Sequence, residues 1–402
     1  MKKLRVGILF GGRSGEHAVS LLSAASVLQA IDRKKYEIIP IGITKEGRWV
    51  SASDAERLLN GGSATEVRNL RAGDPEATSA AAVLARGESV IVPPVPSQKK
   101  NKALVPFETS ARAVDVQAGS RALDLDVVFP VLHGTFGEDG TVQGLLELAG
   151  IAYVGSGVLG SSAGMDKDVM KRLFAAAKLP ITKHVSFLRA EWESSPRKIA
   201  TKIEAALKYP LFVKPANLGS SVGISKVHDR KELAPALRLA AKYDRKIVVE
   251  QGVGGKRGKA RELEVAVLGN DRPEASVVGE IVPGEEFYSY ESKYLKEGSV
   301  PVIPAKLTKQ QSKQVREMAV AAFQACDCSG LARVDFLMDS GPTGRIYLNE
   351  INTLPGFTSI SMYPKLWEAS GVPYPELINR LIALALERRA EKDRNSYSFD
   401  EG

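Results

Sequence analysis

Two pairs of polar side chains interrupt apolar runs near the C-terminus, and their spacing could serve metal and phosphate chemistry. Glu350 and Asn352 lie two residues apart in one run, and Arg333 and Asp335 share that spacing in the run before it. Strand side chains alternate between faces, so the members of each pair point the same way. The turn-rich segment 339–344 between the runs predicts a β-hairpin that brings the two pairs together.

A hairpin that is symmetric about this turn would pair Arg333 with Glu350 and Asp335 with Leu348, with all four polar side chains on one face. Carboxylate and amide oxygens are hard ligands that suit Mg²⁺. An arginine is a permanent cation that suits negative charge developing on a phosphate or oxyanion. A solvated sheet face with ordinary ion pairs is the alternative interpretation.

A second group of residues is typical of phosphate binding. Segment 219–223 reads Gly-Ser-Ser-Val-Gly, and such loops can wrap a phosphate with backbone N–H groups. Lys214 precedes this loop, Lys167 stands at an expected helix start, and lysines serve as point charges for phosphates. Each signal alone is weak, because Gly/Ser loops and surface lysines are common. Together with the acid pair they predict a site for a nucleoside triphosphate.

Three further segments carry polar or aromatic groups next to expected strands. Segment 11–16 follows the first strand, and ligands of open parallel sheets bind at the carboxyl ends of strands. Glu16 in this segment suits an ammonium group rather than a phosphate. Glu138 and Asp139 also follow a strand and are expected to serve a turn. Segment 287–295 is rich in tyrosine, and it either closes over a site as a loop or forms a strand with alternating aromatics.

The order of the elements predicts an α/β protein with a parallel sheet at its N-terminus. An apolar strand at 4–10 is followed by a turn, a helical pattern and a second apolar strand at 36–44, which is a β-α-β unit. The pattern fades over 60–122, which we interpret as an elaborated surface region with short strands. The last helix is expected at 375–389. A chain of 402 residues exceeds one ordinary core and predicts two or three domains.

Residues 155–160 match the pattern G-x-G-x-x-G between a strand and a helix, which is the dinucleotide-binding fingerprint. A nicotinamide-dependent oxidoreductase would also need an acid roughly 20 residues further on, at the end of the next strand. The segment at that place, 179–188, has no acid at its tip. A tight strand-to-helix connection is therefore the better interpretation.

The composition excludes several classes of protein. With 44% hydrophobic and 25% charged residues the chain has the profile of a soluble globular protein, and without a run of 18 apolar residues no membrane partner is expected. The formal net charge is +8, but the basic residues are scattered among acids, which favours a small anionic substrate over nucleic acid. Cys326 and Cys328 are expected to be two thiols of a cytosolic protein.

The chain resembles the D-alanine–D-alanine ligases of the ATP-grasp superfamily in seven segments that occur in this order: GGRSGEHAVS, FPVLHGTFGEDG, GSGVLGSSAGMDK, VKPANLGSSVGISKV, FYSYESKYL, GLARVDF and LNEINTLPGFTSISMYP. The resemblance covers nearly the whole chain except 60–122 and the polar tail. It implies a cytoplasmic homodimer that joins two D-alanines at the expense of ATP for peptidoglycan precursor synthesis. The implied architecture is a Rossmann-like N-terminal substrate-binding domain at 1–155, a central domain at 156–249, a C-terminal catalytic domain at 250–390 and a tail at 391–402.

The resemblance also implies roles for individual residues. The reaction centre would comprise Glu16, Ser220, Tyr294, Arg333 and the backbone N–H of Gly356. The D-alanines would contact Glu16, His133, Lys293, Ser361 and Met362. ATP would contact Lys167, Lys214, Ser220, Ser221, Glu250, Gln251, Val253 and Glu262. Two Mg²⁺ or Mn²⁺ ions would be held by Asp335, Glu350 and Asn352.

Two other functions remain open beside the dipeptide ligase. Relatives that make D-alanyl-D-lactate differ in the lid loop, and Tyr294 resembles the D-alanine type. A non-catalytic nucleotide-binding protein would have no need of Arg333 or Glu350. Some relatives place a lysine where this chain has Gln251, and the Gly/Lys-rich insert 252–261 begins just after it.

Overall fold

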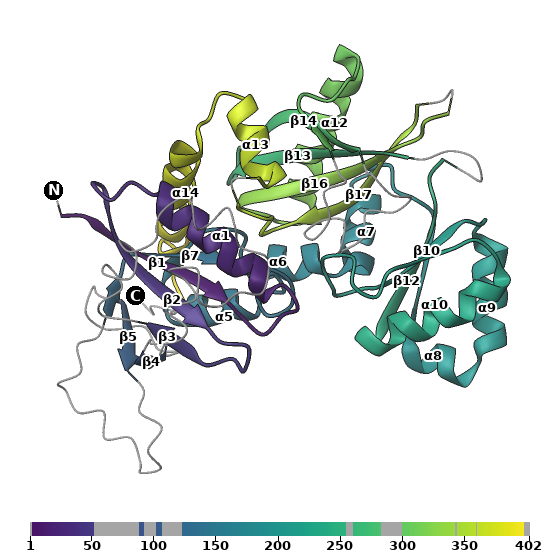
Figure 1. Ribbon diagram of the computed structural model, residues 1–402, viewed down its shortest axis with the longest axis horizontal. Coiled ribbons are helices and arrows are strands. Elements are labelled where there is room, and N and C mark those ends of the chain that lie inside the picture. The colour runs from purple at the N-terminus through teal and green to yellow at the C-terminus, as the bar shows by residue number, and fades with distance from the viewer. Residues whose placement is uncertain are drawn as a thin grey trace, which may run out of the picture.

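Three β-sheets organise the protein, and the computed structural model in Figure 1 arranges them as three lobes. Within the described residues the N-terminal sheet has eight strands, the central sheet four and the C-terminal sheet five. This is the predicted α/β architecture, although the first sheet is mixed: its strands β2, β1, β7 and β8 are parallel and the others antiparallel, and the two later sheets are antiparallel. The structure describes residues 2–51, 88–91, 102–106, 123–254, 260–282, 300–341, 344–358 and 360–397.

Strand β1 (Leu4–Gly11) lies between two parallel neighbours, β2 (Tyr36–Ile43) and β7 (Val127–Val131), and α1 (His17–Ala30) connects β1 to β2. The last six residues of β1 are buried, as expected of an apolar strand that is covered on both faces. The short strand β8 (Ala152–Tyr153) continues the parallel part beyond β7. The predicted β-α-β start is confirmed.

An antiparallel ribbon extends the same sheet beyond β2. The strands predicted within 60–122 are present at two places, and the rest of that region lies outside the described residues. At the opposite edge of the sheet, α5 (Thr141–Leu148) precedes the edge strand β8. The ribbon consists of β3 (Trp49–Ser51), β4 (Glu88–Ile91), β5 (Lys102–Pro106) and β6 (Leu123–Leu125).

The central sheet is antiparallel in the order β11-β10-β12-β9. Ile203 and Leu237, from two of its helices, are buried against the sheet in one apolar cluster. The burial of one stripe on each helix explains why these amphipathic segments fold as helices. The elements are β9 (His184–Leu188), α8 (Arg189–Ser194), α9 (Pro196–Ala206), β10 (Leu211–Pro215), β11 (Ser225–Val227), α10 (Arg230–Tyr243) and β12 (Lys246–Gln251).

The C-terminal sheet is antiparallel in the order β15-β14-β13-β16-β17, and helices cover both of its faces. Val265 and Val267 belong to the cluster beneath α12, whereas Ala266 and Leu268 belong to the cluster beneath α13. This alternation is the strand period of two. The elements are β13 (Arg261–Gly269), β14 (Glu274–Val282), β15 (Val300–Val302), α12 (Lys309–Ala325), β16 (Gly330–Met338), β17 (Ile346–Asn352) and α13 (Met362–Ala369).

Two helices, α6 (Val158–Met165) and α7 (Lys167–Ala176), lead from the N-terminal lobe to the central lobe. Gly155 has φ of +102°, a backbone conformation that favours glycine. A Cβ on Gly160 would lie 2.4 Å from the backbone oxygen of Asp327, so close packing excludes a side chain there. The glycines of the dinucleotide-like pattern therefore serve a tight strand-to-helix connection, as expected.

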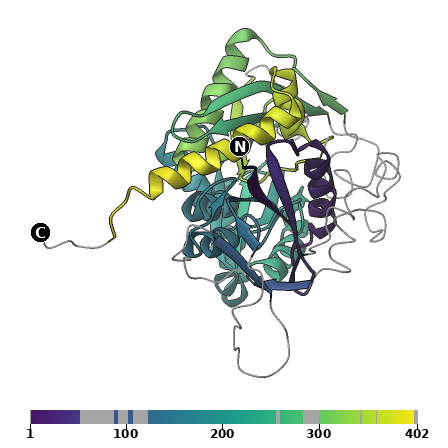
Figure 2. The same cartoon turned by 90° about the vertical axis from the view of Figure 1, so that its left-hand side faces the viewer.

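Helix α14 (Tyr374–Lys392) joins the C-terminal and N-terminal lobes and crosses the molecule in Figure 2. The guanidinium carbon of Arg388 lies 4.2 Å from the centre of the Tyr153 ring, and Lys392 forms an ion pair with Glu147. These contacts hold the last turns of the helix. It therefore runs three residues beyond its predicted end at 389 and two residues into the polar tail.

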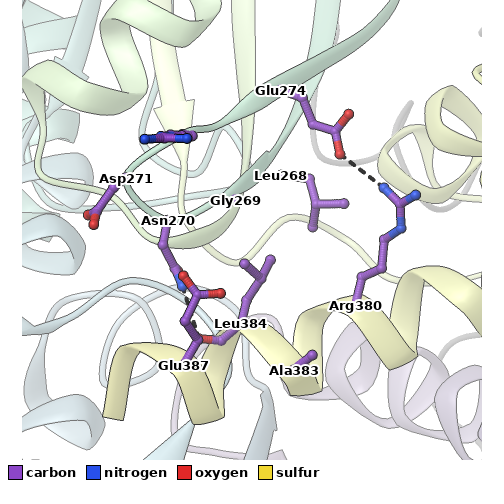
Figure 3. Close-up of a pocket in the computed structure, with 10 residues that line it drawn as sticks. Leu268, Gly269, Asn270, Asp271, Glu274, Arg380, Ala383, Leu384 and Glu387 are labelled. Carbon is purple, nitrogen blue, oxygen red and sulfur yellow. Dashed lines mark hydrogen bonds and ion pairs between the residues drawn. The ribbon is translucent and has the colours of Figure 1, made fainter. Parts of the chain in front are cut away.

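A cavity of about 550 Å³ lies between α14 and the turn that joins β13 to β14 (Figure 3). In its wall, Asn270 Nδ2 donates to the backbone oxygen of Leu384 over 3.1 Å, and Asn270 Oδ1 accepts from the backbone N–H of Gly330 over 3.3 Å. Arg380 pairs with Glu274 at 2.9 Å. These polar groups dock α14 on the C-terminal sheet.

Candidate active site

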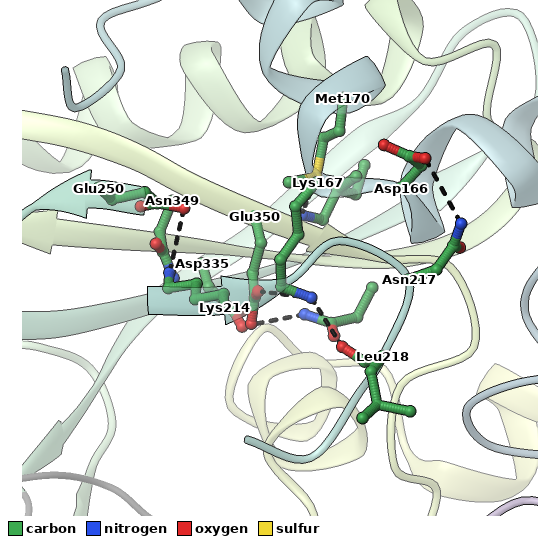
Figure 4. Close-up of polar contacts among 12 residues, drawn as sticks. Asp166, Lys167, Met170, Lys214, Asn217, Leu218, Glu250, Asp335, Asn349 and Glu350 are labelled. Atoms are coloured by element: carbon green, nitrogen blue, oxygen red, sulfur yellow. Dashed lines mark hydrogen bonds and ion pairs between the residues drawn. The ribbon is translucent and has the colours of Figure 1, made fainter. Parts of the chain in front are cut away.

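Helix α7 and strands β12 and β17 meet where the central and C-terminal sheets adjoin (Figure 4). The backbone N–H of Leu348 donates to the backbone oxygen of Pro180 over 2.7 Å, so the segment that enters the central sheet runs beside β17. Met170 Sδ on α7 accepts from the backbone N–H of Ile351 over 3.3 Å. The candidate site residues of α7, β12 and β17, which come from separate segments of the chain, therefore lie together where the central and C-terminal sheets adjoin.

The predicted hairpin forms, but its predicted register is wrong. Arg333 lies opposite Asn352, and Asp335 lies opposite Glu350. The register shifts next to these pairs because Asn349 is an extra residue in β17, which makes a β-bulge. The prediction that the four polar side chains share one face is nevertheless confirmed, because directly opposed residues in an antiparallel pair point the same way.

A dense set of contacts occupies this polar face. Arg333 Nε and one terminal nitrogen of its guanidinium donate to the two carboxylate oxygens of Asp335 over 2.8 and 2.7 Å. Asn352 Nδ2 donates to Asp335 Oδ2 over 2.9 Å, and Arg333 Nε lies 3.2 Å from Glu264 Oε2. Burial alone would lower the pKa of Arg333, but Asp335 and Glu264 raise it well above its ordinary value. The arginine therefore carries a permanent charge.

The two lysines predicted to bind phosphate lie beside this face, and each contacts specific oxygen acceptors. Lys167 Nζ donates to the backbone oxygen of Leu218 over 2.8 Å and lies 3.9 Å from Glu350 Oε2. Lys214 Nζ lies 3.2 Å from Glu250 Oε1. A loop carbonyl and two acids thus fix both ammonium groups at the junction shown in Figure 4.

Lys171, a residue that the sequence analysis did not select, shares the carboxylate of Glu250. Its Nζ lies 3.3 Å from Glu250 Oε2, and Thr182 Oγ1 donates to the same oxygen over 3.2 Å. Burial would raise the pKa of Glu250, but Lys171 and Lys214 lower it to about 2. The Glu250 side chain is therefore ionised and committed to the lysines, so its contact with an adenine base would come from its backbone.

The Gly/Ser loop of the central lobe reaches the first glutamate of the N-terminal lobe. A Cβ on Gly219 would lie 2.6 Å from Glu16 Oε1, and a Cβ on Gly134 would lie 3.1 Å from the same atom. Ser220 and Ser221 have φ of 48° and 60°, which is strained for residues with side chains. Strain of this kind gathers at ligand sites, and the N–H groups of turns can form concave arrays that bind anions.

His133 links the N-terminal lobe to the loop after β17. Its Nδ1 lies 3.0 Å from the backbone oxygen of Leu354, and its Nε2 lies 3.1 Å from Ser23 Oγ. Burial lowers the pKa of His133, which favours the neutral ring. The predicted substrate residue is therefore enclosed between lobes as a neutral hydrogen-bonding group.

Glu138 was expected to serve a turn, and the structure confirms this and adds a second contact between lobes. Burial, with Glu16 nearby, raises its pKa to about 8. Its Oε1 accepts from the backbone N–H of Gly134 over 2.8 Å, and its Oε2 accepts from that of Leu354 over 3.4 Å. Asp139 also serves the turn, since it accepts from the backbone N–H groups of residues 136 and 141. Glu138 serves the turn through Gly134 and also joins two lobes through Leu354.

Gly356 and Ser361 adjoin at the start of α13. A Cβ on Gly356 would lie 3.0 Å from Ser361 Oγ, and that oxygen is 2.7 Å from Thr358 Oγ1. The Met362 side chain is buried against Gly279 in the sheet below, so it could contact a substrate only through its backbone. Of the residues predicted for the acceptor substrate, the structure brings Ser361 to Gly356.

For the remaining predicted residues, the structure either gives no contact with the site residues above or does not describe them. Gln251 turns its side chain away, and its Oε1 accepts from the backbone N–H of Lys208 over 3.1 Å. Val253 lies in the turn after β12, and Glu262 lies in β13 opposite residues 281 and 337. The predicted lid residues Lys293 and Tyr294 fall outside the described residues, as do 255–259 of the Gly/Lys-rich insert.

The polar face fits a hard divalent cation by its chemistry. Asp335 and Glu350 supply carboxylate oxygens and Asn352 an amide, but in the part of the chain that the structure describes no three His, Cys, Asp or Glu side chains cluster at metal-binding distance. Mg²⁺ commonly takes one or two carboxylates and leaves its other positions to phosphate and water. None of the described helices is long and apolar enough to cross a membrane.

A partly parallel N-terminal sheet is followed by two antiparallel sheets, with lysines and an acid–amide face where these two adjoin, and this arrangement defines an ATP-grasp enzyme as the class of protein. Residues 5–156 match the family model of the D-ala D-ala ligase N-terminus, and residues 173–383 match that of the D-ala D-ala ligase C-terminus. The chain belongs to the D-alanine–D-alanine ligase family.

Relatives match over the full length. A D-alanine–D-alanine ligase of Natranaerobius thermophilus is 49% identical over 401 residues, which is 100% of each chain. The ligase of Geobacillus kaustophilus is 49% identical and covers 99% of this chain and 98% of its own. Among solved structures, the D-alanine–D-alanine ligase from Coxiella burnetii has a TM-score of 0.76 and 33% identity, covering 98% of this chain and 97% of its own. VanG D-Ala:D-Ser ligase from Enterococcus faecalis has a TM-score of 0.76 and 35% identity, covering 96% and 100%.

Proposed function

We propose that this protein joins two D-alanines to D-alanyl-D-alanine and converts ATP to ADP and phosphate, as its family relationship supports. One contact carries the proposal at the level of the site. Glu16 of the N-terminal lobe meets Gly219 of the central lobe, where a Cβ would lie 2.6 Å from the carboxylate. An acceptor for an ammonium group thus adjoins a loop suited to phosphate, which is the arrangement that phosphorylation of an amino acid carboxylate needs.

The first step activates the first D-alanine. A carboxylate is a poor acyl donor, because its leaving group would be oxide. Attack of a carboxylate oxygen on the γ-phosphorus breaks the bond to ADP and gives an acyl phosphate, whose leaving group is phosphate. Lys167 and Lys214 would neutralise the phosphoryl oxygens, which is the main need in phosphoryl transfer. Glu16 would hold the ammonium group, and the backbone of Ser220 and Ser221 would line the phosphate.

The second step forms the peptide bond. The neutral amine of the second D-alanine attacks the acyl carbon, and the tetrahedral intermediate then collapses with release of phosphate. Arg333 and the backbone N–H of Gly356 would face the oxyanion, and the raised pKa of Arg333 keeps its charge in place. Ser361 and Lys293 would receive the carboxylate of the second D-alanine. Ser220, Tyr294 and Glu16 would form one hydrogen-bond network, with His133 and the backbone of Met362 beside the substrates.

We also propose that Asp335, Glu350 and Asn352 hold two Mg²⁺ or Mn²⁺ ions. Bound ions would neutralise the oxygens of the triphosphate. Asn352 now donates through Nδ2 to Asp335, and only its Oδ1 can serve as a ligand. The backbone of Glu250, Gln251 and Val253 would hold the adenine, with Glu262 near the ribose.

The organisation of the chain follows from the same relationship. We propose domain limits near residues 155, 249 and 390, a homodimer, and a cytoplasmic location where ATP and D-alanine are available. The end of the N-terminal sheet at β8 supports the first limit, and the central sheet ends with β12 at Gln251, two residues beyond the second. Sedimentation of the purified protein would test the homodimer directly.

The decisive experiment measures phosphate release from ATP and Mg²⁺, with the product identified by mass. The substrates are D-alanine alone, L-alanine alone, D-alanine with D-lactate, and D-alanine with D-serine. The proposal expects turnover with D-alanine alone and D-alanyl-D-alanine as product. Turnover only with a mixed pair would assign a different acceptor, such as the D-serine named for the Enterococcus structure. Addition of EDTA should abolish turnover, and excess Mg²⁺ or Mn²⁺ should restore it.

A further inference from the structure

Lys171 lies one helical turn after Lys167 on α7, and none of the steps described above uses it. Its side chain is fully buried, at 0% exposure. A buried ammonium group is strongly unfavourable unless charged and polar partners replace the lost water. The partners are Glu250 Oε2 at 3.3 Å and the backbone oxygen of Asn349, to which Lys171 Nζ donates over 3.4 Å. A lysine kept in such a place needs an explanation.

The contact of Lys171 with Glu250 changes the net charge next to the expected phosphate site. Lys214 and Glu250 alone form a pair of zero net charge, with Lys214 Nζ 3.2 Å from Glu250 Oε1. Lys171 adds one positive charge to the other oxygen of the same carboxylate. Two ammonium groups and one carboxylate sum to +1. The buried lysine therefore converts a neutral pair into a net cation at the edge of the expected phosphate site.

The contact of Lys171 with the backbone oxygen of Asn349 affects β17, the strand that carries the proposed metal ligand Glu350. Asn349 is the extra residue of the bulge in β17, and it immediately precedes Glu350. Lys171 ties the carbonyl of the bulge to α7, and Met170 Sδ accepts from the backbone N–H of Ile351 beside it. Helix α7 thus holds β17 on both sides of Glu350. One ammonium group contacts both the lysine–glutamate pair and the bulge.

We propose that Lys171 is a positioning residue for the nucleotide phosphates: it neutralises Glu250, so that Lys214 presents net positive charge, and it fixes the bulge that directs Glu350. This inference rests on the proposed function, because it takes Lys214 and Glu350 to face a triphosphate. Nucleotide binding can be measured without D-alanine, so the two can fail separately. A wild-type protein that binds ADP but makes no dipeptide would remove the proposed function and leave the role of Lys171 standing.

The first test compares ADP and adenosine binding by titration calorimetry in the presence of Mg²⁺. Lys171→Met keeps the length of the side chain and removes its charge. We expect it to weaken ADP binding at least tenfold and adenosine binding less than twofold, because adenosine has no phosphate. Arg172→Met is the matched control. Arg172 is the next residue on α7, has the same charge and is 72% exposed at its side chain. This variant should bind both ligands as the wild type does.

The second test uses charge compensation. In the double variant Lys171→Met/Glu250→Gln the cluster returns to +1 through Lys214 alone while the bulge stays unsupported, so ADP should bind at least threefold more tightly than to Lys171→Met. ADP binding by Lys171→Met at wild-type strength would overturn the proposal. Equal losses for ADP and adenosine would show a merely structural role, and so would a double variant weaker than the single one.

Circular dichroism and the thermal midpoint establish whether each variant folds. If Lys171→Met does not fold, Glu250→Gln alone decides the question. Its cluster carries +2 from the two lysines, so ADP should bind at least as tightly as to the wild type. Weaker ADP binding by this folded variant, with adenosine binding unchanged, would overturn the proposal.

Discussion

Leu348 and Glu350 lie on opposite faces of β17, although strand residues two positions apart ordinarily share a face. The intervening Asn349 is the cause, because it has no counterpart in β16 and its bulge reverses the alternation. Leu348 is fully buried in the core of the C-terminal lobe. Glu350 faces Lys167 on the polar side at 3.9 Å. A single extra residue therefore lets one short strand serve both the core and the site.

Replacement of Glu350 should separate chemistry from folding. Glu350→Gln keeps the size of the side chain and removes the charge that would hold a metal and face Lys167. We expect kcat for phosphate release to fall at least about 100-fold, while the thermal midpoint changes by less than about 2 °C. Glu274→Gln, at an exposed glutamate of β14, is the control and should leave kcat unchanged. A wild-type rate in Glu350→Gln would remove the metal assignment.

The contact between Glu16 and Gly219 should respond to one added methyl group. In Gly219→Ala the new Cβ would lie 2.6 Å from Glu16 Oε1, so the carboxylate must move. We expect KM for D-alanine to rise roughly tenfold, which corresponds to about 1.4 kcal/mol, while KM for ATP stays within threefold. Gly144→Ala is the control, because a Cβ there meets no atom within 4 Å. Equal rises in both KM values would show that the whole loop is distorted instead.

Local patterns were sufficient to predict most elements and the polar face, since both depend on alternation and helical spacing along the chain. The register of β16 and β17 was not predictable, because the symmetric turn gave no sign of the bulge. Asparagine is depleted in strands, but its presence at 349 does not locate a bulge, and the carbonyl of Asn349 is contacted by Lys171 of α7, from a distant segment. Bulges of this kind are set by tertiary contacts rather than by the sequence nearby.

The role of Lys171 and the burial of Glu138 between lobes were not predicted, for a related reason. Lys171 looks like an ordinary helix lysine, and its only signal is the four-residue spacing from Lys167 on one face of α7. Glu138 and Asp139 are adjacent acids that both serve one turn, yet only Glu138 also reaches the backbone of another lobe, at Leu354. In both cases the packing of another lobe determines the burial of the charge, and a single sequence carries no direct record of that packing.

The contact of α14 with the N-terminal lobe should contribute to stability. Arg388 lies over the ring of Tyr153 and donates to its backbone oxygen over 3.3 Å. Arg388→Met removes the cation while keeping much of the apolar stem, and we expect a loss of about 1–2 kcal/mol in the free energy of unfolding. Denaturant unfolding monitored by circular dichroism measures this loss. Arg394→Met alters an arginine that is 75% exposed at its side chain and should have no effect; equal stability of both variants would contradict the prediction.

The raised pKa of Glu138 predicts how stability depends on pH. Burial, with Glu16 nearby, moves this pKa from 4.5 to about 8 in the folded protein. Between these values the folded state binds more protons than the unfolded state, so this group makes the free energy of unfolding fall as pH rises. Glu138→Gln cannot titrate, and its free energy of unfolding should fall less between pH 5 and pH 8, by roughly 1–3 kcal/mol. Denaturant unfolding at four pH values across this range measures the difference, with Glu317→Gln, at a side chain that is 67% exposed, as the control. Parallel pH profiles for Glu138→Gln and the wild type would show that Glu138 is ionised throughout and that its burial between the lobes does not hold a proton.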